Sequence, residues 1–161
     1  MKGIRLSEAQ ARFVQGGVSI VISSRDRRRV PSLSRALACR VADNLRSMQV
    51  LLARSQSIQL LQDIETCGRV AVVFCQPFTH ETYQIKSDDA QVLPAWDHAE
   101  ADRMTHARAF ADHVIPMGFS RDYGLVVHAA RIEDCVAVGF TPQVLYAQTP
   151  GPDAGERIAP P

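Results

Sequence analysis

Residues 48–75, MQVLLARSQSIQLLQDIETCGRVAVVFC, change their apolar spacing twice. Met48 to Leu52 has the length and composition of a strand. From Ser55 to Cys67 the apolar residues recur at helical spacing, and Gly68 stands where a C-terminal cap glycine belongs. Val70 to Cys75 is apolar throughout, which is typical of a buried strand. The stretch therefore predicts a strand, a helix and a second strand in that order.

Upstream of this stretch, the sequence predicts a short helix and two further extended segments. Apolar residues at helical spacing indicate a helix over residues 6–14, within an N-terminal segment 1–14. A β-branched run predicts a strand over 18–23, and the charged residues 25–29 have the character of a hairpin turn with a solvated tip. Pro31 opens a second extended run through Val41. Together with the strand at 48–52 these segments predict an antiparallel meander.

Downstream, the pattern continues with alternating strand and helix signals. Glu81 to Ser87 alternates as a strand does, and residues 99–115 have the apolar spacing of an amphipathic helix. Arg131 to Phe140 is the last clear strand, and Val144 to Ala147 is expected to extend the same sheet. The segment 149–161 is rich in Pro and Gly, and we expect a mobile tail.

Size and composition are those of one globular domain. The chain has 161 residues, 46% hydrophobic and 22% charged, with a formal net charge of +1. We expect a single α+β domain over 1–161 built around a closed antiparallel sheet. The small net charge gives no support for a nucleic-acid partner, and no apolar run has the length of a membrane span. The N-terminus lacks the apolar segment of a signal peptide, so a cytoplasmic location is the expectation.

Cysteine and histidine positions predict no metal site. Because the four cysteines form no CxxC pair, we expect them to be buried apolar side chains. His98, His106 and His113 fall on or near the predicted long helix, but no carboxylate or cysteine completes a ligand set, so solvent-facing histidines are predicted.

Three short segments carry candidate binding residues. In the run 31–41, Leu33, Arg35, Leu37 and Cys39 are predicted to share one face, and Ser34, Ala36, Ala38 and Arg40 the other. The second segment precedes the helix and contains Arg54, Ser55, Gln56 and Ser57, of which either serine can be the N-cap. A helix N-terminus with an arginine and two hydroxyls suits a phosphate, although many helices begin with Ser or Arg for structural reasons alone.

The third segment is the strand at 81–87. There Gln84 and Lys86 share one face, opposite Tyr83 and Ile85. A glutamine amide both donates to and accepts from the polar edge of a heterocycle. Taken by itself, however, this strand favours the interpretation of an exposed polar face.

Taken in order, these segments resemble the flavin-binding split-barrel family that includes the pyridoxamine 5′-phosphate oxidases. The family's Arg-x-Val-Leu-Leu-Lys strand is similar to Arg35-Ala-Leu-Ala-Cys-Arg40, and its Ser-Arg-Lys before a helix is similar to Arg54-Ser55-Gln56. The family's flavin-contacting glutamine is matched by Gln84. The resemblance implies a split β-barrel, antiparallel and Greek-key-like, mainly β within the α+β class, with two or three flanking helices.

The resemblance also implies a homodimer with FMN at the subunit interface. Its cofactor-binding residues would be Arg35, Arg40, Arg54, Ser55, Gln56, Ser57, Gln84 and Lys86. The implied activity is that of an FMN-dependent oxidoreductase acting on a small molecule, with no catalytic residue assigned. The chain lacks the family's C-terminal Arg-x-His, so vitamin B6 oxidation is not expected. The alternatives are a non-catalytic protein that binds flavin, the deazaflavin F420 or haem, and a dimeric module without a cofactor.

Overall fold

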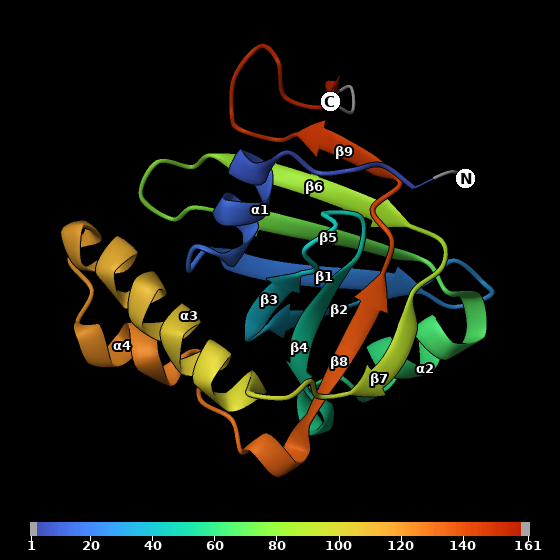
Figure 1. Ribbon diagram of the computed structural model, residues 1–161, viewed down its shortest axis with the longest axis horizontal. Coiled ribbons are helices and arrows are strands. Elements are labelled where there is room, and N and C mark those ends of the chain that lie inside the picture. Colours follow the sequence, from blue (N-terminus) through green and yellow to red (C-terminus); the bar gives the residue numbers. More distant parts are fainter. Residues whose placement is uncertain (1–2, 159–161) are drawn as a thin grey trace.

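The strands of the computed structural model, which describes residues 3–158, lie in two antiparallel sheets (Figure 1). The strand order is β10-β9-β6-β5-β1-β2 in the six-stranded sheet and β3-β4-β8-β7 in the four-stranded sheet. The bounds in the six-stranded sheet are β1 Ser19–Arg25, β2 Pro31–Ala36, β5 Val70–Cys75, β6 Thr82–Ser87, β9 Val144–Ala147 and β10 Arg157–Ile158. Those in the four-stranded sheet are β3 Ala38–Val41, β4 Met48–Ala53, β7 Gln91–Pro94 and β8 Cys135–Phe140.

Helices flank these sheets. The α-helices are α1 Glu8–Gln15, α2 Ile58–Cys67, α3 Ala99–Val114 and α4 Arg121–Val126, with short 3₁₀ turns at Arg54–Gln56, Ile115–Met117 and Ile132–Asp134. Ser7 begins α1 with a reciprocal capping box to Gln10. Gly68 ends α2 at a φ of 62°, a left-handed conformation that glycine adopts without steric cost.

The main core lies between the two sheets. Alternate side chains of β1 and β5 are fully buried, and the residues between them are half-buried. The largest buried contributors from the sheets are Ile20, Ile22, Met48, Leu52, Phe74 and Ile85. Full burial of one such side chain contributes about 1.5–3 kcal/mol. Leu60 and Ile64 of α2 join this core, which explains the apolar stripe of that helix.

A second, smaller cluster covers part of the outer face of the four-stranded sheet. It contains Leu37, Ala38, Leu51, Ala53, Ala99 and Cys135, with Trp96 packed against them. The start of α3 therefore lies over one half of this face. The other half, around Arg40, stays open.

The extended run 31–41 is not one strand, contrary to prediction. It leaves the six-stranded sheet after Ala36 and enters the four-stranded sheet at Ala38, and the Leu37 N–H donates to the carbonyl of Leu51 at 2.8 Å. This break shifts the alternation by one residue. Ala36 and Cys39, predicted on opposite faces, are both buried in the main core.

Other predictions are confirmed or corrected at the level of single elements. The strand-helix-strand order of 48–75 is confirmed, and the helix predicted over 99–115 is observed as α3 at Ala99–Val114. β9 was predicted to extend the sheet of β8, but it pairs with β6 in the six-stranded sheet. Neither β7 nor α4 was predicted.

Both ends of the described chain also differ from expectation. The first helix begins at Glu8, because Ile4 and Leu6 donate backbone hydrogen bonds to Pro142 and Leu45. The tail is not free, since Arg157–Ile158 pairs with β9. Residues 1–2 of the predicted N-terminal segment and 159–161 of the tail lie outside the described residues. None of the helices in the described part of the chain combines the length and the apolar character that a membrane span requires.

Candidate functional site

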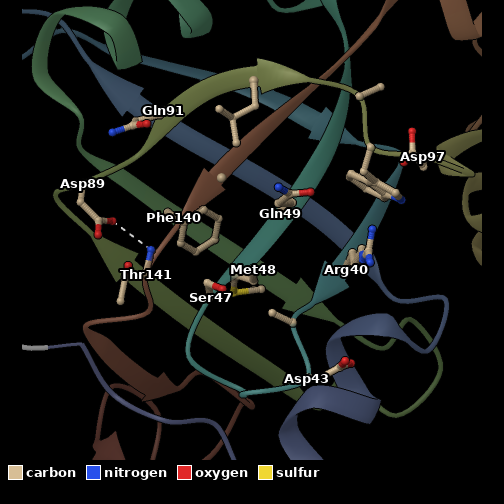
Figure 2. Close-up of a pocket in the computed structure, with 15 residues that line it drawn as sticks. Arg40, Asp43, Ser47, Met48, Gln49, Asp89, Gln91, Asp97, Phe140 and Thr141 are labelled. Atoms are coloured by element: carbon tan, nitrogen blue, oxygen red, sulfur yellow. Dashed lines mark hydrogen bonds between the residues drawn. The ribbon is translucent and has the colours of Figure 1, made fainter.

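A groove of about 750 Å³ lies on the open half of the outer face of the four-stranded sheet (Figure 2). Its floor is a row of cross-strand neighbours, Arg40, Gln49, Gly139 and Gln91, one from each strand. Because opposite residues of antiparallel strands point to the same face, the three side chains project together. Figure 2 shows Arg40 and Gln49 side by side, with Gln91 and Asp89 at the other end of the groove.

Two features shape this groove for a flat ligand. A Cβ on Gly139 would come within 2.7 Å of the Leu93 side chain, so glycine allows Leu93 to lie close over the floor between the two glutamines. Trp96 forms part of the wall, and its indole N–H donates to the Asp102 carboxylate at 2.8 Å. An aromatic wall and amide groups on the floor suit a planar heterocycle with a polar edge.

Charge in the groove favours a neutral ligand. Arg40 is accompanied by three carboxylates, those of Asp43, Asp89 and Asp97. Partial burial raises the pKa of Asp89, but hydrogen bonds from the Ser87 hydroxyl and the Thr141 N–H together hold that pKa below its usual value. Asp89 is therefore ionised at neutral pH. A phosphate dianion inside this groove would meet more negative than positive charge.

The start of α2 places Ser55 against a carboxylate of the same chain. The Asp134 side chain accepts hydrogen bonds from the Ser55 hydroxyl and, at 3.1 Å, from its backbone N–H. The donors predicted to hold a phosphate therefore already hold an anion. Arg54 and Gln56 are exposed beside them, and Arg54 borders a separate hollow that also contains Glu65 and Glu133.

Ser57 is engaged in the interior. It is buried, and its hydroxyl lies 2.8 Å from the hydroxyl of Ser34. It occupies the N-cap position of α2 but makes no side-chain capping bond. This hydroxyl–hydroxyl hydrogen bond links β2 to the start of α2.

The remaining predicted residues lie on the six-stranded sheet. Arg35 and Gln84 belong to one cross-strand row, separated by Val21 and Val73, and the row continues through Tyr146 to Arg157. The Arg35 guanidinium donates to the Ser19 hydroxyl at 3.2 Å. Within one chain, this row and the groove are on the outer faces of different sheets.

Lys86 extends over Tyr146, with its ammonium 5.0 Å from the ring centroid. The eight predicted residues are thus divided among four places: the groove, the start of α2, the outer row of the six-stranded sheet, and a hollow at the end of that sheet. Their roles toward a cofactor stay predictions.

The histidine prediction is wrong for His106. His106 is 3% exposed, and its Nε2–H donates to the Val18 carbonyl at 2.8 Å. Burial, with the neighbouring His128, lowers the pKa of His106 to about 4. His98 is exposed and His113 is half-buried. The helix packs its histidine side against the chain before β1, which sequence spacing alone does not reveal.

The cysteines follow the prediction in part. Cys39 and Cys135 are buried, and burial raises the pKa of both thiols. Cys67 and Cys75 are half-buried. Within residues 3–158, no three His, Cys, Asp or Glu side chains gather as metal ligands would.

Comparisons with solved structures reveal the fold class. A candidate pyridoxamine 5′-phosphate oxidase from Lactobacillus delbrueckii aligns with 91% of this chain and 100% of its own, with a TM-score of 0.55 at 16% identity. HupZ from Group A Streptococcus covers 93% and 100%, with a TM-score of 0.56 at 11% identity. An F420 reductase covers 87% and 98%, with a TM-score of 0.51 at 10% identity. The chain has the pyridoxamine 5′-phosphate oxidase-like split-barrel fold. No protein-family profile and no curated sequence matches it.

This split barrel fits the ring of a flavin better than its phosphate. The groove offers two amides, an indole and the apolar side chain of Leu93, all suited to a heterocycle. At the start of α2, a phosphate would first have to displace Asp134 from Ser55. The donors there do not fit the FMN phosphate as they stand.

Sequence reasoning missed several groove residues of the split barrel. Gln49 is the single polar residue among the apolar residues of β4, and Gly139 interrupts β8. A polar residue in an apolar strand and a glycine inside a strand are both visible in the sequence, so Gln49 and Gly139 were detectable. Gln91 was not detectable, because β7 carries no strand pattern of its own. Asp134 becomes a partner of Ser55 only through a fold that joins residues 79 positions apart.

Proposed function

We propose that this protein binds the ring of a flavin or a related heterocycle in the groove of the four-stranded sheet. The observation that carries the proposal is the row Arg40, Gln49, Gly139 and Gln91 beside Trp96. The fold supports it, because an F420 reductase has the same architecture. The volume of about 750 Å³ lies in the range of small-molecule sites.

Each groove residue has a distinct part in this proposal. The amides of Gln49 and Gln91 can donate to and accept from the polar edge of the ring. Arg40 can donate to a carbonyl or a single anionic oxygen at one end. Trp96 offers an aromatic surface, and Gly139 leaves room for the Leu93 side chain, which offers an apolar one.

We propose that the bound ring serves a flavin-dependent oxidoreductase acting on a small molecule, without a clamp for the FMN phosphate. A flavin supplies hydride and electron transfer when bound, and the protein orients the ring and shields it. No acid or base of this chain is required for that role. The cytoplasmic location expected from the sequence remains part of the proposal.

The homodimer expected from the resemblance is also part of the proposal. The outward side chains of β1 and β5 are half-buried rather than fully exposed, and Leu33 on neighbouring β2 is 70% exposed. An outer sheet face of this kind suits a second copy of the chain. Sedimentation equilibrium tests it, and a monomer at high concentration would contradict it.

Titration with riboflavin and with FMN, followed by flavin fluorescence, tests the binding proposal. We expect the two ligands to bind within about threefold of each other, because the groove holds the ring and no clamp holds the phosphate. Gln49→Ala should weaken both at least fivefold. Gln62→Ala is the control, since Gln62 is exposed on α2 and does not line the groove. Equal losses from both variants would contradict the proposed groove.

One observation favours the second candidate, a dimeric split-barrel module without a cofactor. Asp134 fills the donors of Ser55 from within the chain, which stabilises the start of α2 without any ligand. Under this candidate the purified protein is colourless, and neither flavin, F420 nor haem binds in a saturable manner. A Soret band in the purified protein would instead indicate haem.

A further inference from the structure

A second hollow, of about 550 Å³, lies at one end of the six-stranded sheet. At this end β1 and β6 finish while β2, β5 and β9 begin, as the antiparallel register requires (Figure 1). Four cations line the hollow: Arg25, Arg29, Arg69 and Lys86. They come from three separate segments of the chain, so the fold and not the sequence gathers them.

These cations are poorly neutralised. Among residues 3–158, no carboxylate forms an ion pair with any of the four. Arg25 donates to the backbone carbonyl of Asp26 at 3.3 Å, and Lys86 lies over the Tyr146 ring. The one carboxylate in the lining, Asp88, accepts from the side-chain amide of Gln143 and makes a further interaction. Four like charges around one hollow repel each other unless an anion is bound.

Hydrogen bonds within the turn between β1 and β2 fix the backbone that carries Arg25 and Arg29. The Asp26 carboxylate accepts from the Val30 N–H at 2.7 Å, and the Asp26 carbonyl accepts from the Arg29 N–H at 3.1 Å. Arg29 adopts a φ of 68°, a conformation that non-glycine residues seldom adopt. Arg29 borders the hollow, whereas Arg27 and Arg28 in the same turn do not.

The rest of the lining combines hydroxyls with an apolar surface. The Ser23 hydroxyl donates to the Ala71 carbonyl at 3.2 Å and retains its acceptor capacity, and Ser87 lies nearby. Pro31, Val70 and Ala71 contribute apolar surface. A bare anion needs only the cations, so the apolar part indicates a ligand with an organic portion as well.

We propose that this hollow binds a phosphorylated small molecule with at least two negative charges, of the diphosphate or nucleoside diphosphate class. Guanidinium groups donate pairs of parallel hydrogen bonds to phosphate oxygens, and three of the four cations are arginines. The site is a local hollow and not an extended basic stripe, which disfavours a nucleic-acid strand. The proposal does not depend on the flavin groove, which lies on the other sheet.

Calorimetric titration with ADP and with inorganic pyrophosphate tests this proposal. The double variant Arg25→Gln/Arg69→Gln should lower ADP affinity at least tenfold. The control Arg27→Gln/Arg28→Gln removes the same amount of charge beside the hollow and should change ADP affinity less than twofold. ADP should bind more tightly than adenosine by at least tenfold. Equal losses in the two double variants would overturn the proposal, since the effect would then be one of general charge.

Two further outcomes would also overturn it. The first is the absence of saturable ADP and pyrophosphate binding to the folded wild-type chain at millimolar ligand. The second is tighter binding of a short oligonucleotide than of ADP, with the same loss of oligonucleotide affinity in both double variants. That result would indicate a nucleic-acid surface. Thermal denaturation of each variant confirms that the comparison is made on folded protein.

Discussion

The carboxylate of Asp134 accepts hydrogen bonds from both the backbone N–H and the hydroxyl of Ser55. Asp134 ends the 3₁₀ turn before β8, and Ser55 belongs to the turn before α2. The pair therefore joins the segment after β4 to the segment before β8, at one end of the two inner strands of the four-stranded sheet. It also places a fixed negative charge where the sequence predicts a phosphate.

Removing this carboxylate should change ligand preference. In Asp134→Ser the Ser55 donors are free and one negative charge is lost, so FMN should bind at least fivefold more tightly than riboflavin, whereas the wild type binds the two alike. Parallel fluorescence titrations measure the ratio. Glu133→Ser is the control, since Glu133 is exposed, pairs with Arg131 at 3.7 Å and is not the carboxylate that accepts from Ser55. An unchanged ratio in Asp134→Ser would show that the start of α2 is not an anion site.

The same variant should lower stability modestly. A charged hydrogen bond at a partly exposed site contributes about 1 kcal/mol, so the free energy of unfolding should fall by roughly that amount. Urea denaturation measures it. A loss of several kcal/mol would mean that Asp134 holds the whole turn in place.

Stability should fall in mild acid because of His106. Its pKa is about 4 in the folded protein, against about 6.5 for an ordinary histidine, so the unfolded chain takes up the proton first as the pH falls. The neutral ring's contribution is therefore complete above pH 6.5 and is lost progressively from pH 6.5 to pH 4. A pKa difference of about 2.5 corresponds to about 3 kcal/mol over that interval.

Urea denaturation across this pH range checks the prediction. His106→Gln retains an N–H that can reach the Val18 carbonyl but does not titrate, so its stability should depend much less on pH between 6.5 and 4. Burial also lowers the pKa of His128, and the pKa of Asp89 is held below its usual value, so both groups contribute to the slope left in the variant. His98→Gln, at an exposed site, should keep the wild-type slope. A wild-type profile that is flat from pH 6.5 to pH 4 would contradict the assignment.

Packing between α3 and α4 depends on the absence of a side chain at Gly124. A Cβ there would lie 2.5 Å from the Ala111 Cα and 2.6 Å from its Cβ. Gly124→Ala should therefore destabilise the protein by about 1–3 kcal/mol, even though alanine favours helices. Val126→Ala in the same helix is the control, because Val126 is 70% exposed and should cost under about 0.5 kcal/mol. Thermal denaturation compares them, and a more stable Gly124→Ala would show that the two helices separate readily.

Local spacing predicted the elements well wherever one periodicity covers a whole element. The helix ending at Gly68 and the buried strand Val70–Cys75 are of this kind. The bend at Leu37 was hidden because both halves of the run 31–41 are extended, and only the Leu37–Leu51 hydrogen bond shows where the sheets divide. The candidate site was harder still, because strand partners bring Gln49 and Gly139 together from distant parts of the chain.

Trp96 allows the groove to be observed directly, because it is the only tryptophan of the chain. Its indole N–H donates to Asp102 at 2.8 Å, and this bond holds the ring at the groove wall. Asp102→Ala removes the acceptor, so the indole should become more mobile and acrylamide should quench its fluorescence about twofold more efficiently. Riboflavin should quench Trp96 in the wild type and bind three- to tenfold more weakly to the variant. Asp112→Ala, on an exposed part of the same helix, should leave both signals unchanged. If riboflavin binds without any change in Trp96 emission, its ring lies outside this groove.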